Sequence, residues 1–160
     1  MSRDIVIHIG DEPTEIYFVV SGILRSYYID ISGDDKTQLF INENSFYANE
    51  YFLDMEPSKC CVEALEDCTV LVVEWRDLVH LLESNVYCMK AYIKALEYSI
   101  RYKIGRENSF LLKSATERYL DFKKKYVHLE KRVNQSYIAS YLGITPVSLS
   151  RIRRTIKDEN

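Results

Sequence analysis

No apolar run in the sequence of 160 residues approaches the roughly 18 to 20 residues that a membrane-spanning helix requires. Residues 1–10 also lack the charged start, the apolar stretch and the cleavage site that together mark a secretory signal peptide. These absences argue against a membrane-spanning protein and against a secreted one. We therefore expect a cytoplasmic protein that has no membrane partner.

Cysteine and histidine are too few and too poorly spaced for the common metal sites. The four cysteines form neither a CxxC pair nor a spaced quartet, which argues against a zinc ribbon and against a disulfide framework. A β-roll enzyme of the cupin type needs several histidines on its strands, and the region expected to form strands contains only His8. We expect free thiols in the interior, no metal site, no resident cofactor and no enzymatic activity.

The net charge of −3 conceals two halves of opposite sign. Residues 1–84 carry 5 Lys and Arg against 17 Asp and Glu, a net charge of −12, whereas residues 85–160 carry 16 against 7, a net charge of +9. The 47% of hydrophobic and 28% of charged residues are typical of a folded chain, long enough for one ordinary domain or two small ones. The basic half is a candidate for binding a polyanion such as nucleic acid, and the alternative is a solvated helical surface rich in lysine.

Short apolar runs separated by turn formers predict a small all-β unit in the first half of the chain. Residues 14–20 and 23–31 are rich in β-branched and aromatic side chains. A turn at 32–35 leads into a returning strand at 36–41, which predicts a hairpin. Residues 69–73 (TVLVV) are apolar throughout, so we expect this strand to be covered on both faces.

Beyond Trp75 the apolar period changes to that of helices, and Ser84-Asn85 offers an N-cap for a long helix. Four residues of this helix have the 4-3-4 spacing of a coiled-coil seam: Met89, Ile93, Leu96 and Ile100. So narrow a seam favours a partner helix and hence a homodimer, and packing against the β unit is the alternative. Gly105 is expected to end or loosen the helix. The sequence thus predicts three parts: an all-β unit at 1–84, a long helix at 85–109 that is a candidate for dimerisation, and a basic helical region at 110–160.

Residues 134–152 have the spacing of a helix-turn-helix. Ala139 stands where the two helices cross, Gly143 ends the first helix with a positive φ, Thr145 is an N-cap and Pro146 takes the first helical position. The positions expected to be buried are apolar: Ile138, Leu142, Ile144, Leu149 and Ile152. We expect a DNA-binding helix-turn-helix, and a merely structural helical hairpin is the alternative.

The outward residues of the second helix have distinct expected roles. Val147, Ser148 and Arg151 lie near its N-terminal end, where a recognition helix contacts base edges, and Arg151 has the planar fork that matches guanine. The residues expected to contact phosphates are Ser136, Thr145, Ser150, Arg153, Arg154 and Lys157. Further phosphate contacts are expected from the lysines and arginine at 123–125 and 131–132.

Particular segments resemble a known family. They are residues 117–120 (ERYL), 138–146 (IASYLGITP) and 149–153 (LSRIR) in the basic half, and 16–22 (IYFVVSG) and 64–71 (ALEDCTVL) in the acidic half. These segments are similar to the CRP/FNR family of bacterial transcription regulators, and to its Bacteroidetes-type branch in particular. The similarity extends over nearly the whole chain.

The resemblance implies an α+β fold in which a cyclic-nucleotide-binding-like β-roll is followed by a long dimerisation helix and a C-terminal helix-turn-helix domain. It implies a homodimer that binds a two-fold symmetric promoter site in double-stranded DNA, with RNA polymerase as a further partner. The family usually has a helix and a strand before the equivalent of Gly10-Asp11, and a β-wing after the recognition helix. We therefore expect an N-terminally short β-roll and no evident wing.

The effector cassette departs from the family's pattern. In cyclic-AMP-binding members a Gly-Glu pair contacts the ribose and an Arg-Ser pair holds the cyclic phosphate; the corresponding residues here are Asn49, Glu50, Lys59 and Cys60. A lysine supplies a point charge without the bidentate fork of arginine, and the neighbouring acidic residues disfavour an anion. Cyclic AMP, another small effector and no ligand at all are the three alternatives, and the first is disfavoured.

The sequence therefore predicts a homodimeric, sequence-specific DNA-binding transcription regulator that a small effector in the β-roll could modulate. The alternative from another class is a sensor or protein-interaction module whose helix-turn-helix does not bind DNA. Salt-dependent DNA binding distinguishes the two.

Overall fold

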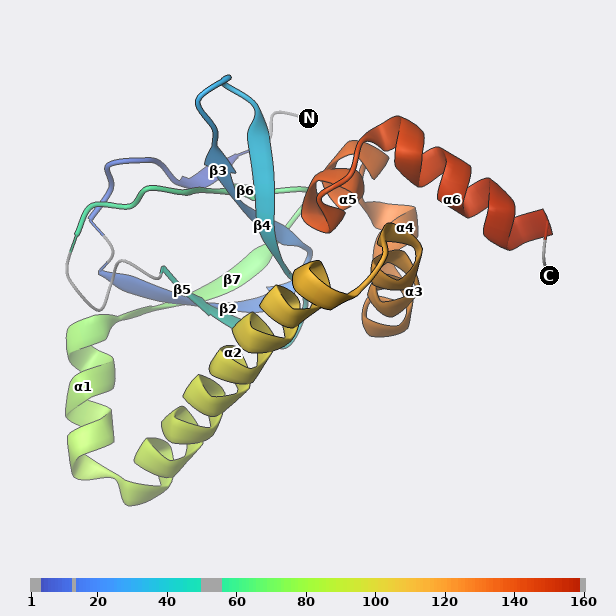
Figure 1. The fold of residues 1–160 in the computed structure, drawn as a ribbon. Coiled ribbons are helices and arrows are strands. Elements are labelled where there is room, and N and C mark those ends of the chain that lie inside the picture. The colour runs from blue at the N-terminus through green and yellow to red at the C-terminus, as the bar shows by residue number, and fades with distance from the viewer. Residues whose placement is uncertain (1–3, 13, 50–55, 159–160) are drawn as a thin grey trace. The chain divides into compact units, whose positions relative to one another are not determined.

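The computed structural model describes residues 4–12, 14–49 and 56–158 (Figure 1). The chain forms two compact units, Met1–His80 and Leu81–Asn160. Strands make up most of the first unit and helices make up the second, so the fold is mixed α+β with the sheets before the helices, as the sequence predicts. The domain limits expected at residues 84 and 109 are a finer division and stay predictions.

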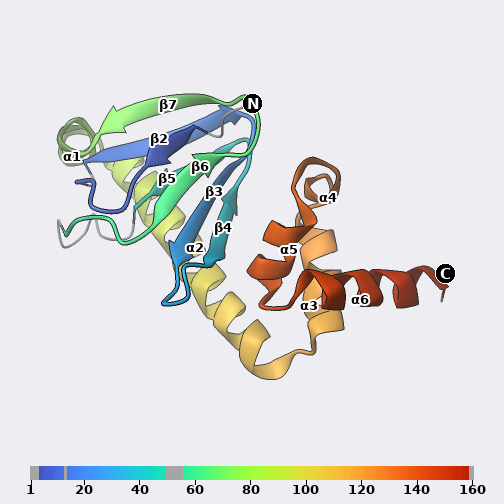
Figure 2. The ribbon, with the colours of Figure 1, turned by 90° about the horizontal axis from the view of Figure 1, so that it is seen from above.

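The described strands of the first unit form two antiparallel sheets, which Figure 2 shows from above. One sheet has the strand order β1-β6-β3-β4 and the other the order β5-β2-β7. The strands are β1 (Ile5–Ile7), β2 (Glu15–Ser21), β3 (Leu24–Ile29), β4 (Asp35–Ile41), β5 (Ser45–Ala48), β6 (Cys61–Ala64) and β7 (Thr69–Glu74). Every pair is antiparallel, which allows short connections between successive strands.

Side chains of both sheets meet in one hydrophobic core. The buried residues of this core are Ile7, Tyr17, Val19, Leu24, Ile41, Tyr47 and Val62. Each apolar side chain of this size contributes about 1.5 to 3 kcal/mol when it leaves water. The core therefore fixes which face of each strand points inward.

The hairpin expected at residues 32–35 is present between β3 and β4. Asp30 closes it, because its Oδ1 accepts hydrogen bonds from the backbone N–H of Ser32 at 2.8 Å and of Asp34 at 3.0 Å. This side-chain-to-backbone bonding is the reason that aspartate favours turns.

The expectation that residues 69–73 are covered on both faces is wrong. β7 is an edge strand that pairs only with β2 in the described sheet, and Leu71, Val72 and Val73 are exposed. Val70 is the β7 residue that packs against the core. An apolar run of this length indicates a strand, but it does not distinguish an edge strand from a central one.

The helices are α1 (Trp75–Ser84), α2 (Val86–Leu112), α3 (Ala115–Lys125), α4 (Leu129–Arg132), α5 (Gln135–Leu142) and α6 (Pro146–Asp158). Asn85 caps α2 as expected: its Oδ1 accepts hydrogen bonds from the backbone N–H of Tyr87 at 2.9 Å and of Cys88 at 3.3 Å. Of the helices that the structure describes, none combines the length and the apolarity that crossing a membrane requires.

Gly105 does not end the long helix, contrary to expectation. α2 continues through it to Leu112, about two turns past Gly105. One glycine inside a helix costs only about 1 kcal/mol relative to alanine, and the following turn is held by Arg106, whose Nη2 donates a hydrogen bond to the carbonyl oxygen of Tyr141 at 2.8 Å. A contact distant in sequence thus outweighs the local preference.

Two glycines of the second unit are expected to respond oppositely to alanine. Gly143→Ala should lower the free energy of unfolding by about 1 kcal/mol or more, because Gly143 has a φ of +67° and a Cβ there would lie 2.7 Å from the ring of Phe110. Gly105→Ala should raise it by about 0.5 to 1 kcal/mol, since nothing lies within 4 Å of the added Cβ. Thermal unfolding followed by circular dichroism measures both changes in stability. Equal effects of the two substitutions would contradict these expectations.

Candidate nucleic-acid interface and effector pocket

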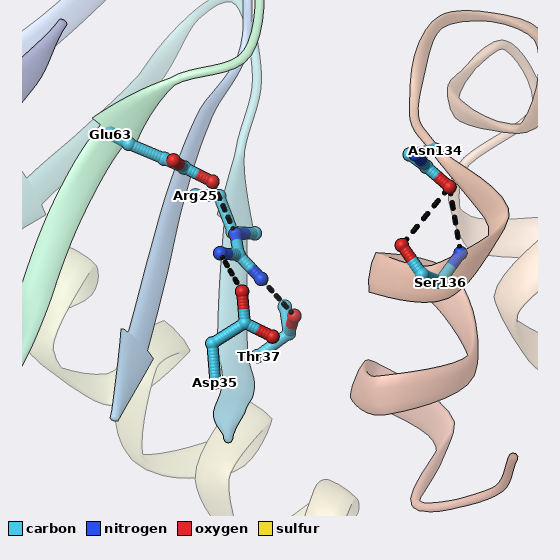
Figure 3. A network of polar contacts seen from close by, with 6 residues as sticks. All are labelled: Arg25, Asp35, Thr37, Glu63, Asn134 and Ser136. Carbon is cyan, nitrogen blue, oxygen red and sulfur yellow. Dashed lines mark hydrogen bonds and ion pairs between the residues drawn. The ribbon is translucent and has the colours of Figure 1, made fainter. Parts of the chain in front are cut away.

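The first helix of the predicted helix-turn-helix is α5, and its start is fixed by Asn134. The Oδ1 of this residue accepts hydrogen bonds from the backbone N–H and from the hydroxyl of Ser136, both at 3.0 Å (Figure 3). Asparagine is among the preferred N-cap residues, because its oxygen satisfies an N–H that has no partner in the helix. The hydroxyl of Ser136, an expected phosphate contact, is therefore held at the N-terminus of α5.

The connection between α5 and α6 is short and closed by side-chain caps. Gly143 adopts the left-handed conformation and its N–H donates to the carbonyl oxygen of Ser140 at 3.0 Å. Thr145 caps α6, since its Oγ1 accepts a hydrogen bond from the backbone N–H of Ser148 at 3.1 Å and lies 2.9 Å from the Ser148 hydroxyl. Pro146 begins α6, where its missing N–H leaves no bond unmade. These caps fix the direction in which α6 leaves the turn.

Apolar packing holds the two helices together. Ala139 is completely buried, which leaves no space for a larger side chain at this point of α5. Ile138, Leu142 and Leu149 are almost completely buried as well, whereas Ile144 and Ile152 are half-buried. An aromatic cluster completes the core of this unit, with ring centroids 5.2 to 6.0 Å apart: Phe122, Tyr126 and Tyr141.

Two arginines secure the C-terminal end of α5. In addition to the bond from Arg106 to Tyr141, the Nε of Arg118 donates to the carbonyl oxygen of Leu142 at 3.1 Å. The last carbonyl groups of a helix lack intrahelical partners and carry the negative end of its dipole, so cations stabilise this end. Neither arginine has a role predicted from the sequence. Arg118 stands in the ERYL segment of the family resemblance, which is the signal that could have pointed to it.

The outward side of α6 is exposed and basic. Val147, Ser150, Arg151 and Arg154 are exposed, and Ser148 is half-buried. They occupy successive turns of one helix. Such an exposed, positively charged helix can enter the major groove of DNA, which is wide enough to admit a helix.

Arg153 is placed differently from the other predicted contacts. It is half-buried, and its Nε lies 3.8 Å from the Oε1 of Glu130, a carboxylate that also accepts a hydrogen bond from the hydroxyl of Tyr119. Burial and the bond to Glu130 raise the pKa of Tyr119 above its usual value. Arg153 thus connects α6 to α3 and α4, and its contact with phosphate stays a prediction.

Of the four effector-cassette residues, two lie in the interior of the first unit. Asn49 is buried and its Nδ2 donates to the hydroxyl of Ser58 at 2.7 Å, while the Sγ of the buried Cys60 lies 3.6 Å from the hydroxyl of Tyr47. Lys59 is instead exposed and forms an ion pair with Glu56 at 2.9 Å. Glu50 lies outside the described residues.

A cavity of about 310 Å³ lies beside Asn49. Its described lining includes three carboxylates, those of Asp11, Glu12 and Glu15, and no Lys, Arg or His side chain. The hydroxyl of Tyr17 donates to Glu15 at 2.5 Å, and burial together with this bond raises the pKa of Tyr17. A cavity with this charge disfavours the cyclic phosphate of a nucleotide.

The sequence analysis also missed a buried ionic network in the β unit (Figure 3). Arg25 is 1% exposed, and its Nε donates to Glu63 at 2.7 Å, its Nη1 to Thr37 at 3.1 Å and its Nη2 to Asp35 at 2.6 Å. Arg25 and Glu63 are direct cross-strand partners on β3 and β6. Arg25, a basic residue inside a predicted strand, was the available signal, but the identity of its partners depends on strand register. Among the described residues, no group of three or more His, Cys, Asp or Glu could hold a metal ion.

Comparison with known proteins shows which family the chain belongs to. The cyclic nucleotide-binding domain family matches residues 1–85. No curated protein matches the chain in sequence.

The fold is that of solved regulators. FixK2 from Bradyrhizobium japonicum is 19% identical with a TM-score of 0.80, over 99% of this chain and 82% of that chain. TTHB099, a transcriptional regulator of the CRP family from Thermus thermophilus, is 17% identical with a TM-score of 0.73, over 99% and 85%. The c-di-GMP-responsive global regulator CLP from Xanthomonas campestris is 13% identical with a TM-score of 0.72, over 99% and 84%. Because the family match extends over more than half of the chain, the protein belongs to the cyclic nucleotide-binding domain family, and its fold is that of CRP-like regulators.

Proposed function

We propose that the protein is a sequence-specific DNA-binding transcription regulator of the CRP/FNR type, of the Bacteroidetes-type branch, and that it binds a two-fold symmetric promoter site as a homodimer. The observation that carries the proposal is the α5–turn–α6 geometry, in which a capped and tightly packed pair of helices presents the exposed Val147 and Arg151. The net charge of +9 on residues 85–160 supports a polyanionic partner. The proposal assigns no chemical reaction to the protein.

The homodimer is supported by α2. None of the described residues of this helix is buried in the chain, although it is 27 residues long. The seam residues Ile93, Leu96 and Ile100 are 47%, 41% and 58% exposed, and Met89 is half-buried. Apolar side chains at coiled-coil spacing are stabilised when a second copy of the helix covers them. A two-fold dimer would present two α6 helices to successive major grooves, about 34 to 36 Å apart.

Regulation would act through a shift between two dimer arrangements. An effector in the β-roll, or dimer concentration alone, would change the distance between the two α6 helices, and binding requires about one DNA turn between them. The acidic cavity supports an effector other than a cyclic nucleotide, or none. A cytoplasmic location and RNA polymerase as partner belong to the same proposal.

Arg151 and Arg154 are expected to contribute differently to DNA binding. Arg151→Ala should cost about 1 to 3 kcal/mol at one base position, because it removes a bidentate contact to a base edge. Arg154→Ala should weaken binding to all sequences alike and reduce the slope of affinity against salt, because it removes a phosphate contact. Both side chains are exposed, so neither change should unfold the protein. Affinities for a set of single-base operator variants measure the difference, and equal losses on every site would overturn these roles.

The alternative is a sensor or protein-interaction module whose helix-turn-helix does not bind DNA. Arg153 gives this alternative its support, because one of the predicted phosphate contacts already has a carboxylate partner. Absence of salt-dependent binding to any duplex would favour it.

A further inference from the structure

A second cavity is lined by described residues of the helical unit, and none of these belongs to α6. Its volume is about 230 Å³, and residues of α2, α3 and α5 line it. Of its described lining residues, only Lys125 is among those expected to contact DNA phosphates. It is far larger than one water, whose share of liquid volume is about 30 Å³, so it has room for a phosphate group attached to a larger body.

The lining of this cavity is strongly cationic. Its basic side chains are Arg101, Arg106, Lys113, Arg118 and Lys125. The described lining includes only one carboxylate, Asp121, which is 2.5 Å from the ammonium of Lys113. The cations of the described lining therefore far outnumber its carboxylates. The positively charged side chains that line one cavity repel one another, and an anion bound between them would reduce this repulsion.

Lys125 and Arg106 are the cations best placed to hold such an anion. The Nζ of Lys125 lies 3.6 Å from the ring centroid of Tyr102, and no carboxylate of the described residues forms an ion pair with it. The guanidinium of Arg106 stacks on Tyr141, with its Cζ 3.9 Å from the ring centroid. Partial burial of the ammonium, and then the charge of Arg106, lower the pKa of Lys125 to about 8. The ammonium of Lys125 thus lies in surroundings that disfavour its charged form.

A pair of hydrogen-bonded tyrosine hydroxyls lies beside these cations. The hydroxyl oxygens of Tyr102 and Tyr141 are 3.0 Å apart, and both residues line the cavity. A phosphate offers several oxygens at tetrahedral angles, so it can accept hydrogen bonds from α2, α3 and α5 at the same time. A carboxylate offers only two oxygens in one plane. The arrangement therefore favours a phosphate.

We propose that the cavity between α2, α3 and α5 is a binding site for a small phosphate-bearing anion, held by Lys125, Arg106 and the hydroxyls of Tyr102 and Tyr141. The ligand would join the end of the long α2 to α5, the helix that precedes the exposed α6. By binding only the folded unit it would stabilise that unit in proportion to the logarithm of its concentration. The proposal does not require that the protein binds DNA.

Pyrophosphate is a suitable probe, because it carries two phosphate groups and fits within the cavity volume. Calorimetric titration of the full chain, without divalent cations, should give saturable binding. Lys125→Met should weaken that binding by about tenfold or more, since it removes a charged hydrogen-bond donor while keeping the apolar stem. Arg101→Gln should weaken it more mildly, because Arg101 is exposed and pairs with Glu97 at 3.8 Å. Lys124→Met is the matched control: it removes the same charge from a neighbouring residue that does not line the cavity, and should leave the affinity unchanged.

Three results would overturn the proposal. The first is the absence of saturable pyrophosphate binding, and the second is equal affinities for the Lys125→Met and Lys124→Met variants. The third is competition of pyrophosphate with duplex DNA together with an equal loss of DNA affinity in Lys125→Met, which would assign the site to the DNA backbone. Binding of pyrophosphate that Lys125→Met weakens, and that duplex DNA does not displace, supports a separate small-anion site. If the chain binds no DNA at all, the calorimetric comparison still decides the proposal.

Discussion

Arg25→Met is expected to lower the free energy of unfolding of the β unit by about 3 to 5 kcal/mol, because it leaves a buried carboxylate without its partner. Glu63 is only 5% exposed, and Arg25 is its direct cross-strand neighbour. The same change removes the donors to Asp35 and Thr37. Urea denaturation followed by the fluorescence of Trp75, the single tryptophan, reports on this unit.

Two further variants separate the buried pair from a general loss of charge. Arg25→Met combined with Glu63→Gln should recover part of the stability, since the carboxylate that lost its partner is then neutral. Lys36→Met removes an exposed cation that lies 3.0 Å from Asp30 in the same hairpin. It should leave the urea midpoint of unfolding nearly unchanged. A Lys36→Met effect as large as that of Arg25→Met would show that burial is not what makes the network important.

Leu96→Glu is expected to abolish the homodimer at micromolar concentration. A two-fold dimer contains two copies of the seam, so the change removes two buried leucines and brings two carboxylates together. Leu96 is 41% exposed in the single chain, so the lost burial alone is worth roughly 1 to 2.5 kcal/mol per dimer, or about five- to seventyfold in the dissociation constant. Repulsion between the two carboxylates adds to this loss. Sedimentation equilibrium measures the change directly.

Tyr98→Glu is the matched control for the dimer seam. Tyr98 lies on the same helix and is 67% exposed, but its position falls outside the 4-3-4 spacing of Ile93, Leu96 and Ile100. It should leave the protein dimeric. A dimeric Leu96→Glu protein would place the interface elsewhere, and a monomeric Tyr98→Glu protein would mean that the seam is wider than the spacing indicates.

The parts of the fold that the sequence predicts well are those that depend on local chemistry. The turn at Asp30 and the caps at Asn85 and Thr145 each depend on a side chain bonding to backbone groups a few residues away. Such bonds need no knowledge of the rest of the chain. Gly143 is similar, because a left-handed residue at a helix end is a local requirement.

The parts that the sequence could not predict depend on contacts distant along the chain. The continuation of α2 through Gly105 follows from the bond between Arg106 and Tyr141, which are 35 residues apart. The Arg25 network requires the register of β3, β4 and β6, and the exposure of β7 requires its place at the edge of its sheet. A linear pattern carries neither strand order nor register.

The predicted site likewise has one part that depends on local sequence and another that depends on distant contacts. The helix-turn-helix residues lie within 19 consecutive positions, so their spacing alone places them on two adjoining helices. The effector cassette brings together residues of different elements, and there the structure differs from the family's pattern: Lys59 is exposed beside Glu56, while the cavity next to Asn49 is acidic. Arg153 shows that even a helix-turn-helix residue can have a partner in another helix, here Glu130.

The central claim, that the protein is a dimeric sequence-specific DNA-binding regulator, is tested most directly by selecting bound fragments from a random duplex pool. The purified protein is used at near-physiological salt without added ligand, and the bound fragments are sequenced. The account predicts enrichment of a two-fold symmetric site whose half-sites are centred about 10 base pairs apart, or a multiple of this spacing. Enrichment of no sequence at all, with retention that does not depend on salt, would contradict it.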